Sequence, residues 1–124
     1  MNYMLDANSV IYLLSGAYPR LEARVAACEV GEIGISTLVL AEILYGSTRG
    51  KPPLEGVLNQ LIDQIPLLDF DAAAARAFAQ LPFKWHSYDR LIAAQALSLG
   101  LTVITRNFSD FADVPGLKVE DWTI

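Results

Sequence analysis

The sequence has little cysteine and no long apolar run. Its 124 residues include one cysteine, Cys28, so no disulfide can form within the chain, and a reducing compartment is expected. The longest stretch without a charged residue, Leu91–Thr105, is shorter than the roughly 20 apolar residues that a membrane-spanning helix needs, and Gly100 interrupts it. These absences predict a soluble, cytoplasmic protein that does not enter a membrane.

Basic charge is also scarce. The chain carries 9 Lys and Arg against 14 Asp and Glu, a formal net charge of −5, and its pI is about 4.6. It therefore lacks the electropositive footprint of a general nucleic-acid binder. Bound divalent ions can cancel the charge of clustered acids, so the acidity does not exclude a nucleic-acid substrate. It also suits a partner that offers a basic segment.

What the chain does contain is a regular alternation of strand and helix patterns. Such alternation over 124 residues predicts a single α/β domain, residues 1–124, built on a mainly parallel sheet. The expected strands are Asn2–Leu5, Glu32–Ser36, Ile65–Leu68, Thr102–Thr105 and Lys118–Glu120. The expected helices are Val10–Leu14 with Ser9 as its cap, Pro19 to about Ala27, Leu38–Tyr45, Leu54–Gln64, Ala72–Gln80 and Tyr88–Leu99.

Two acids directly follow predicted strands. Asp6 comes after the first strand, and Asp110, together with Asn107, follows Thr102–Thr105. Because parallel strands end at one edge of the sheet, where ligands bind, these side chains are expected to lie near each other. Each acid also has a plainer interpretation. Asp6 can serve as a turn or cap residue, and Asp110 can lie in a surface loop, where Asp113 competes for the same role.

Two further acids lie on predicted helices. Glu42 is the only charge in its apolar helix, and an isolated buried carboxylate costs several kcal/mol, so it needs a partner unless it reaches a solvated edge. Asp89 lies in the first turn of its helix, where an acid is also favoured by the helix dipole alone.

Carboxylates that converge without a His or Cys cluster indicate hard-oxygen chemistry. Mg²⁺ and Mn²⁺ prefer oxygen ligands and often complete their coordination with substrate phosphates. Such ions activate water and stabilise leaving oxygens in nucleases. The four acids therefore predict a Mg²⁺ or Mn²⁺ site at the carboxyl edge of the sheet.

Four segments resemble the motifs of PIN-domain proteins, and specifically of the VapC-type ribonuclease toxins. They occur in the family's order and spacing and span nearly the whole chain: MLDANSVIYLL, STLVLAEILYG, YDRLIAAQAL and VITRNFSDFADVPGLKVEDW. The resemblance implies a three-layer α/β/α fold around a central, mainly parallel sheet of four to five strands. It also implies a Mg²⁺- or Mn²⁺-dependent endoribonuclease that hydrolyses structured RNA, commonly tRNA, and that forms a homodimer held in check by a cognate antitoxin.

The same resemblance assigns the site residues. The catalytic and metal-binding positions are Asp6, Glu42, Asp89 and Asp110, and Asn107 is an auxiliary ligand or substrate contact. The chain departs from the pattern in two places. Ala7 stands where many relatives have Thr or Ser, and the segment Leu81–Tyr88 before Asp89 is shorter than usual and lacks a Gly-rich approach.

Several other residues have open roles. Arg90 and Arg106 lie beside the acidic motifs and either contact RNA phosphates or pair with local acids. His86, the only histidine, is interpreted as a loop or partner-surface residue rather than a general base. Trp85 is a candidate for base stacking, whereas Trp122 is expected to be packed.

Two alternative functions remain at this stage. One is a PIN-like binding module that has lost catalysis and acts through its partner. The other is a phospho-acceptor receiver domain, which shares the length and the α/β alternation. The receiver reading is disfavoured because a single acid, Asp6, follows the first strand and the late motif offers Arg106 instead of a lysine.

Overall fold

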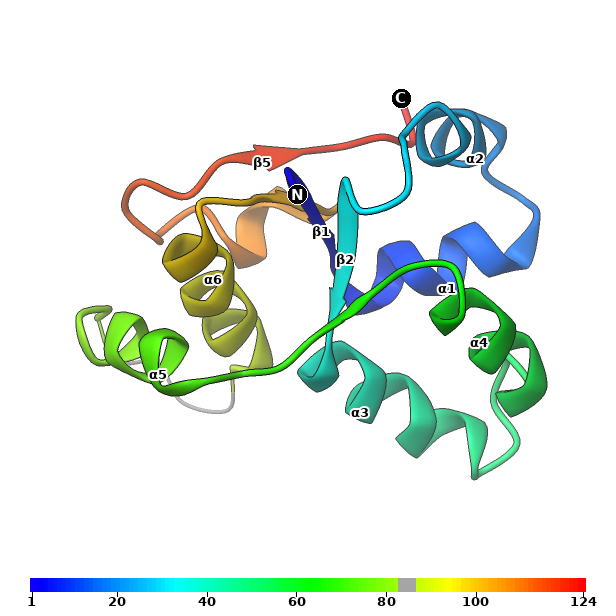
Figure 1. The fold of residues 1–124 in the computed structure, drawn as a ribbon, viewed down its shortest axis with the longest axis horizontal. Coiled ribbons are helices and arrows are strands. Elements are labelled where there is room, and N and C mark those ends of the chain that lie inside the picture. Colours follow the sequence, from blue (N-terminus) through cyan, green and yellow to red (C-terminus); the bar gives the residue numbers. More distant parts are fainter. Residues whose placement is uncertain (83–86) are drawn as a thin grey trace.

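The computed structural model describes residues 1–82 and 87–124. Phe83–His86, and with them the interpretations of Trp85 and His86, lie outside the described residues. Strands and helices alternate along the described chain (Figure 1). The strands are β1 (Tyr3–Leu5), β2 (Ile33–Ser36), β3 (Leu67–Leu68), β4 (Thr102–Ile104) and β5 (Val119–Glu120). The helices are α1 (Ala7–Ser15), α2 (Pro19–Ala26), α3 (Thr37–Ser47), α4 (Glu55–Ile62), α5 (Ala72–Ala79) and α6 (Tyr88–Leu99), and a 3₁₀ turn, η1, spans Phe108–Asp110.

The predicted parallel sheet is confirmed. Within the described residues it has five strands in the order β3-β2-β1-β4-β5, and every neighbouring pair is parallel. In the central register, Met4 of β1 pairs with Gly34 of β2 on one side and with Val103 of β4 on the other. A receiver-type fold has the order 2-1-3-4-5. The observed order differs, so the receiver alternative is wrong.

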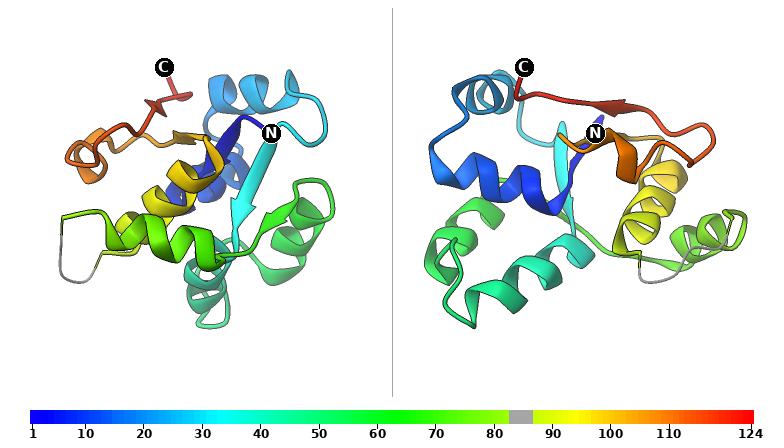
Figure 2. Two further views of the ribbon diagram at one scale, coloured as in Figure 1. Left: turned by 60° about the vertical axis from the view of Figure 1, so that its left-hand side comes forward. Right: turned by 180° about the vertical axis from the view of Figure 1, so that it is seen from behind.

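Helices cover the sheet on both sides, which confirms the three-layer arrangement. Helices α1, α2 and α4 lie to one side of β1 and β2, whereas α5 and α6 lie to the other, and α3 lies below the strand ends (Figures 1 and 2). The core between the layers is apolar and includes fully buried Met4, Leu5 and Val103. Trp122 packs there as predicted, with 2% of its surface exposed and its ring edge-on to Tyr3.

Helix α6 begins and ends where its sequence predicts. The Ser87 hydroxyl accepts a hydrogen bond from the Arg90 amide at 3.1 Å, which caps the helix. Gly100 ends it in the left-handed conformation, with φ of 68°, which glycine adopts without a steric penalty. Within the described residues, no helix is long and apolar enough to cross a membrane.

A buried polar bridge ties α6 to the sheet. The Ser36 hydroxyl at the end of β2 donates to Gln95 Oε1 and accepts from the Leu38 amide, so that it also caps α3. The Gln95 amide donates to the Leu68 carbonyl oxygen at 3.0 Å. Gln95 therefore joins α6 to the carboxyl ends of β2 and β3 through groups that are withdrawn from water.

This bridge predicts a stability loss on Gln95→Leu. Leucine fills a similar volume but leaves the Ser36 hydroxyl and the Leu68 carbonyl without their partner, so the free energy of unfolding should fall by about 2 kcal/mol. Urea denaturation measures it. Gln60→Leu, the same change at an exposed position of α4, is the matched control. Equal stabilities of the two variants would contradict a structural role for the bridge.

Candidate active site

Asp6 is placed at the junction of β1, α1 and β4. Its amide donates to the Ile104 carbonyl at 3.1 Å, and its Oδ1 accepts from the Ser9 amide at 2.8 Å as the N-cap of α1. The predicted start of this helix was wrong, because α1 begins at Ala7 and Asp6 caps it. The Ser9 hydroxyl instead donates to Ile104. A carboxylate has two oxygens, so capping through one leaves the group able to act as a ligand.

Glu42 projects from the second turn of α3 and is half-buried. Within the described residues, its Oε1 is one of two buried side-chain atoms without a hydrogen-bond partner, the other being Arg90 Nη1. Burial, followed by the negative charges of Asp89 and Asp6, raises the pKa of Glu42 to about 7. The structure thus brings these three carboxylates into electrostatic contact.

Asp89 enters this group from the first turn of α6. The three acids therefore come from the starts of two helices, α1 and α6, and from the flank of a third, α3. Asp89 is partly buried and already engaged in a contact. In the described part of the chain, no three Asp, Glu, His or Cys side chains converge closely enough to hold a metal ion together. The partnerless Glu42 oxygen and the all-carboxylate chemistry nevertheless fit a hard divalent cation.

A hollow of about 440 Å³ opens over Glu42. It is lined by Ala41, Glu42, Tyr45 and Tyr88, and both tyrosines are exposed by more than half. The sequence reasoning did not single out these tyrosines as site residues. A signal was present, since Tyr45 follows Glu42 by one helical turn and Tyr88 directly precedes Asp89. The hollow gives a substrate access to the Glu42 carboxylate.

The fourth predicted acid, Asp110, follows β4. It is in η1, where the Asn107 side-chain amide donates to its Oδ2 at 2.7 Å, and the Asn107 carbonyl oxygen accepts from the Ser109 hydroxyl at 3.1 Å. Its competitor Asp113 is bound to a buried arginine: Arg90 is 4% exposed and donates through Nη2 to Asp113. Of the two roles left open for Arg90, the structure shows pairing with a local acid.

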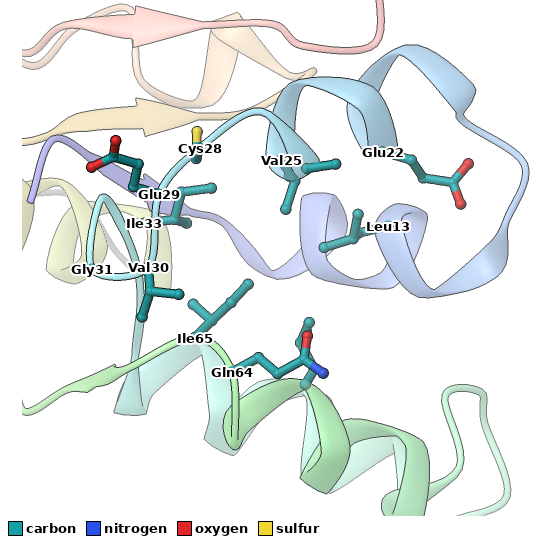
Figure 3. A pocket seen from close by; sticks show the side chains of 12 residues that line it. Leu13, Glu22, Val25, Cys28, Glu29, Val30, Gly31, Ile33, Gln64 and Ile65 are labelled. Carbon is teal, nitrogen blue, oxygen red and sulfur yellow. The ribbon is translucent and has the colours of Figure 1, made fainter.

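A second, more apolar hollow lies between α1, α2 and α4 (Figure 3). Its volume is about 390 Å³, against about 440 Å³ for the hollow over Glu42. Its lining includes five aliphatic side chains: Leu13, Val25, Ile33, Leu61 and Ile65. None of the predicted site residues lines it. Cys28, at its margin, donates to the Arg24 carbonyl, and burial raises the pKa of the thiol.

Comparison with known proteins places this arrangement in a family. The PIN domain family matches residues 3–117, which is most of the chain. The chain therefore belongs to the PIN domain family.

Within that family the chain is of the VapC type. It is 30% identical to the tRNA(fMet)-specific endonuclease VapC of Shigella flexneri, over 99% of each chain. It is also 30% identical to the protein of the same name from Salmonella typhimurium, over 98% of each. Among solved structures, DNA-bound VapBC from Salmonella typhimurium matches with a TM-score of 0.86 at 29% identity, covering 98% of both chains. VapBC2 from Rickettsia felis, bound to a promoter DNA fragment, matches with a TM-score of 0.85 at 25% identity, covering 98% and 99%.

The raised pKa of Glu42 predicts a pH-dependent stability. The pKa is about 7 in the folded chain against an ordinary value of 4.5, so the folded state holds this proton more tightly than the unfolded state does. Without divalent ions, the free energy of unfolding should therefore fall as the pH rises from about 4.5 through 7. Glu42→Gln, which cannot ionise, should lose this fall.

Urea titrations between pH 4.5 and 8 measure the difference between the parent and Glu42→Gln. Glu55→Gln, at an exposed position in the first turn of α4, is the matched control and should keep the parental pH dependence. An identical pH profile for Glu42→Gln and Glu55→Gln would show that Glu42 is not the group responsible.

Proposed function

We propose that this VapC-type chain is a Mg²⁺- or Mn²⁺-dependent endoribonuclease and the toxin of a type II toxin–antitoxin pair. The observation that carries the proposal is the buried Oε1 of Glu42, which has no hydrogen-bond partner among residues 1–82 and 87–124 and feels the charges of Asp6 and Asp89. The charges of the three carboxylates repel one another unless a proton or a cation compensates them. In this proposal a divalent cation, which prefers oxygen ligands, would provide that compensation.

In this proposal Asp6, Glu42 and Asp89 hold the ion, and Asp110 with Asn107 completes the site from η1. When bound, the ion would supply a water of lowered pKa and would offset the charge that develops on the phosphate. Asp6 and Asp89 stand on helix starts that are capped by hydrogen bonds, which limits their movement.

The proposed substrate is a structured RNA, of which tRNA is the first candidate. Two relatives at 30% identity are named tRNA(fMet)-specific endonucleases. The proposed partners are a cognate antitoxin and a second copy of the chain, since the similar solved structures are VapBC complexes. We place this activity in the cytoplasm, where the RNA is. The alternative of a catalytically silent binding module predicts partner binding without cleavage.

Replacement of one acid tests the site. Asp89→Asn removes a charge while keeping the size of the side chain, and RNA cleavage in Mg²⁺ should fall by more than about 100-fold. Gel analysis of a tRNA transcript measures this fall, and EDTA should abolish the parental activity. Asp63→Asn, at the exposed C-terminus of α4, is the control and should cleave like the parent. Undiminished cleavage by Asp89→Asn would place the active site elsewhere.

The net charge of −5 predicts how the antitoxin binds. A cationic antitoxin segment should bind tightly at low salt, and its affinity should fall as salt screens the attraction. Isothermal titration of the purified chain with its antitoxin, at salt concentrations from about 50 to 500 mM, measures how the affinity depends on salt. An affinity that is independent of salt would argue for a purely apolar interface.

A further inference from the structure

One exposed arginine beside the acids is held by aromatic rings rather than by a carboxylate. Arg106 donates through Nη1 to the Tyr18 hydroxyl at 3.2 Å. Its guanidinium lies 5.9 Å from the centre of the Tyr12 ring and 5.7 Å from that of Tyr18. The two rings stack on each other, with centres 4.4 Å apart. This pair of rings orients the guanidinium without neutralising its charge.

Two other arginines near the sheet pair with acids. Arg90 is buried against Asp113, and Arg24 pairs with Glu120 at 3.4 Å. Among the described residues, no recorded ion pair involves Arg106. The charge of Arg106 therefore remains available for an anion. A guanidinium can bind a phosphate through two parallel hydrogen bonds.

Arg106 also lies in a polar hollow next to the candidate active site. The hollow has a volume of about 250 Å³ and is lined by Asn8, Tyr12, Thr105, Arg106 and Asn107. These residues follow the adjacent strands β1 and β4, and the Asp6 amide is hydrogen-bonded to Ile104, two residues before Arg106. The hollow therefore opens at the same edge of the sheet as Asp6.

From this geometry we infer that the hollow is a subsite for the nucleotide next to the scissile phosphate. Arg106 binds that nucleotide's phosphate, and Asn8, which lines the same hollow, lies beside its ribose or base. Tyr12 and Tyr18 are positioning residues that hold the guanidinium. The inference rests on the proposed nuclease function, and it adds a single cationic contact that offsets the repulsion between the carboxylates and the RNA backbone.

The test measures RNA binding in Mg²⁺ by the full chain carrying Asp89→Asn, so that cleavage does not interfere. A fluorescent tRNA transcript is titrated by anisotropy at several salt concentrations. Adding Arg106→Gln should weaken binding about tenfold or more, as expected for a lost hydrogen bond to a charged group. It should also reduce the slope of log affinity against log salt by about 0.7, the value for one phosphate contact on a single strand.

Three further variants separate charge from position. Lys118→Gln removes the same charge at the opposite edge of the sheet, before β5, and should leave affinity and slope unchanged. Arg106→Lys should restore the slope but not the full affinity, because it lacks the planar fork. Tyr18→Phe keeps the ring but loses the hydroxyl that accepts from Arg106, and should weaken binding at an unchanged slope. Circular dichroism checks that each variant is folded.

The outcomes distinguish the two proposals. If the parent cleaves RNA but Arg106→Gln binds like Lys118→Gln, the subsite is wrong and the nuclease function stands. If Arg106→Gln weakens binding of the antitoxin but not of RNA, Arg106 serves a protein interface and the subsite is again wrong. If the parent neither binds nor cleaves RNA in Mg²⁺, both proposals fall together.

Discussion

The candidate active site depends on the hydrogen bonds of one residue, Asp6. Its amide holds the end of β1 to β4, and its carboxylate caps α1. The same carboxylate contributes negative charge to Glu42 on α3. One side chain thus stabilises the turn from strand to helix and adds negative charge near Glu42. This dual role explains why the two interpretations of Asp6 as a cap and as a site residue do not compete: the cap is what holds the carboxylate at the edge of the sheet.

Much of the fold could be predicted because local signals agree with the tertiary structure. Helix α6 is the clearest case, since Ser87 and Gly100 mark its ends and its apolar residues are buried. The predicted start of α1 was wrong because Asp6, Asn8 and Ser9 are all residue types that cap helices well. In the structure the Ser9 hydroxyl donates to the Ile104 carbonyl, which is far away in the sequence, and Asp6 caps the helix. Helix α3 continues through Gly46 to Ser47, whose hydroxyl donates to the Pro53 carbonyl across the following loop.

The site could be predicted only in part, and for a physical reason. Glu42 is conspicuous because a single charge in an apolar helix demands compensation, and its neighbours Asp6 and Asp89 follow from the topology of a parallel sheet. The loop after β4 is different. Asp110 and Asp113 are three residues apart, and their roles are set by whether Asn107 or the buried Arg90 lies within reach. The spacing of apolar residues does not indicate which partner each of these acids has. It also does not indicate that Tyr12 and Tyr18 hold Arg106.

The ion pair between Arg90 and Asp113 has a mechanical consequence. Arg90 is the residue after Asp89, and its buried guanidinium anchors the segment that follows η1 to the first turn of α6. The loop that carries Asp110 is therefore joined by an ion pair to the helix that carries Asp89. The position of this loop relative to Asp89 is thus set by a contact whose guanidinium is withdrawn from water.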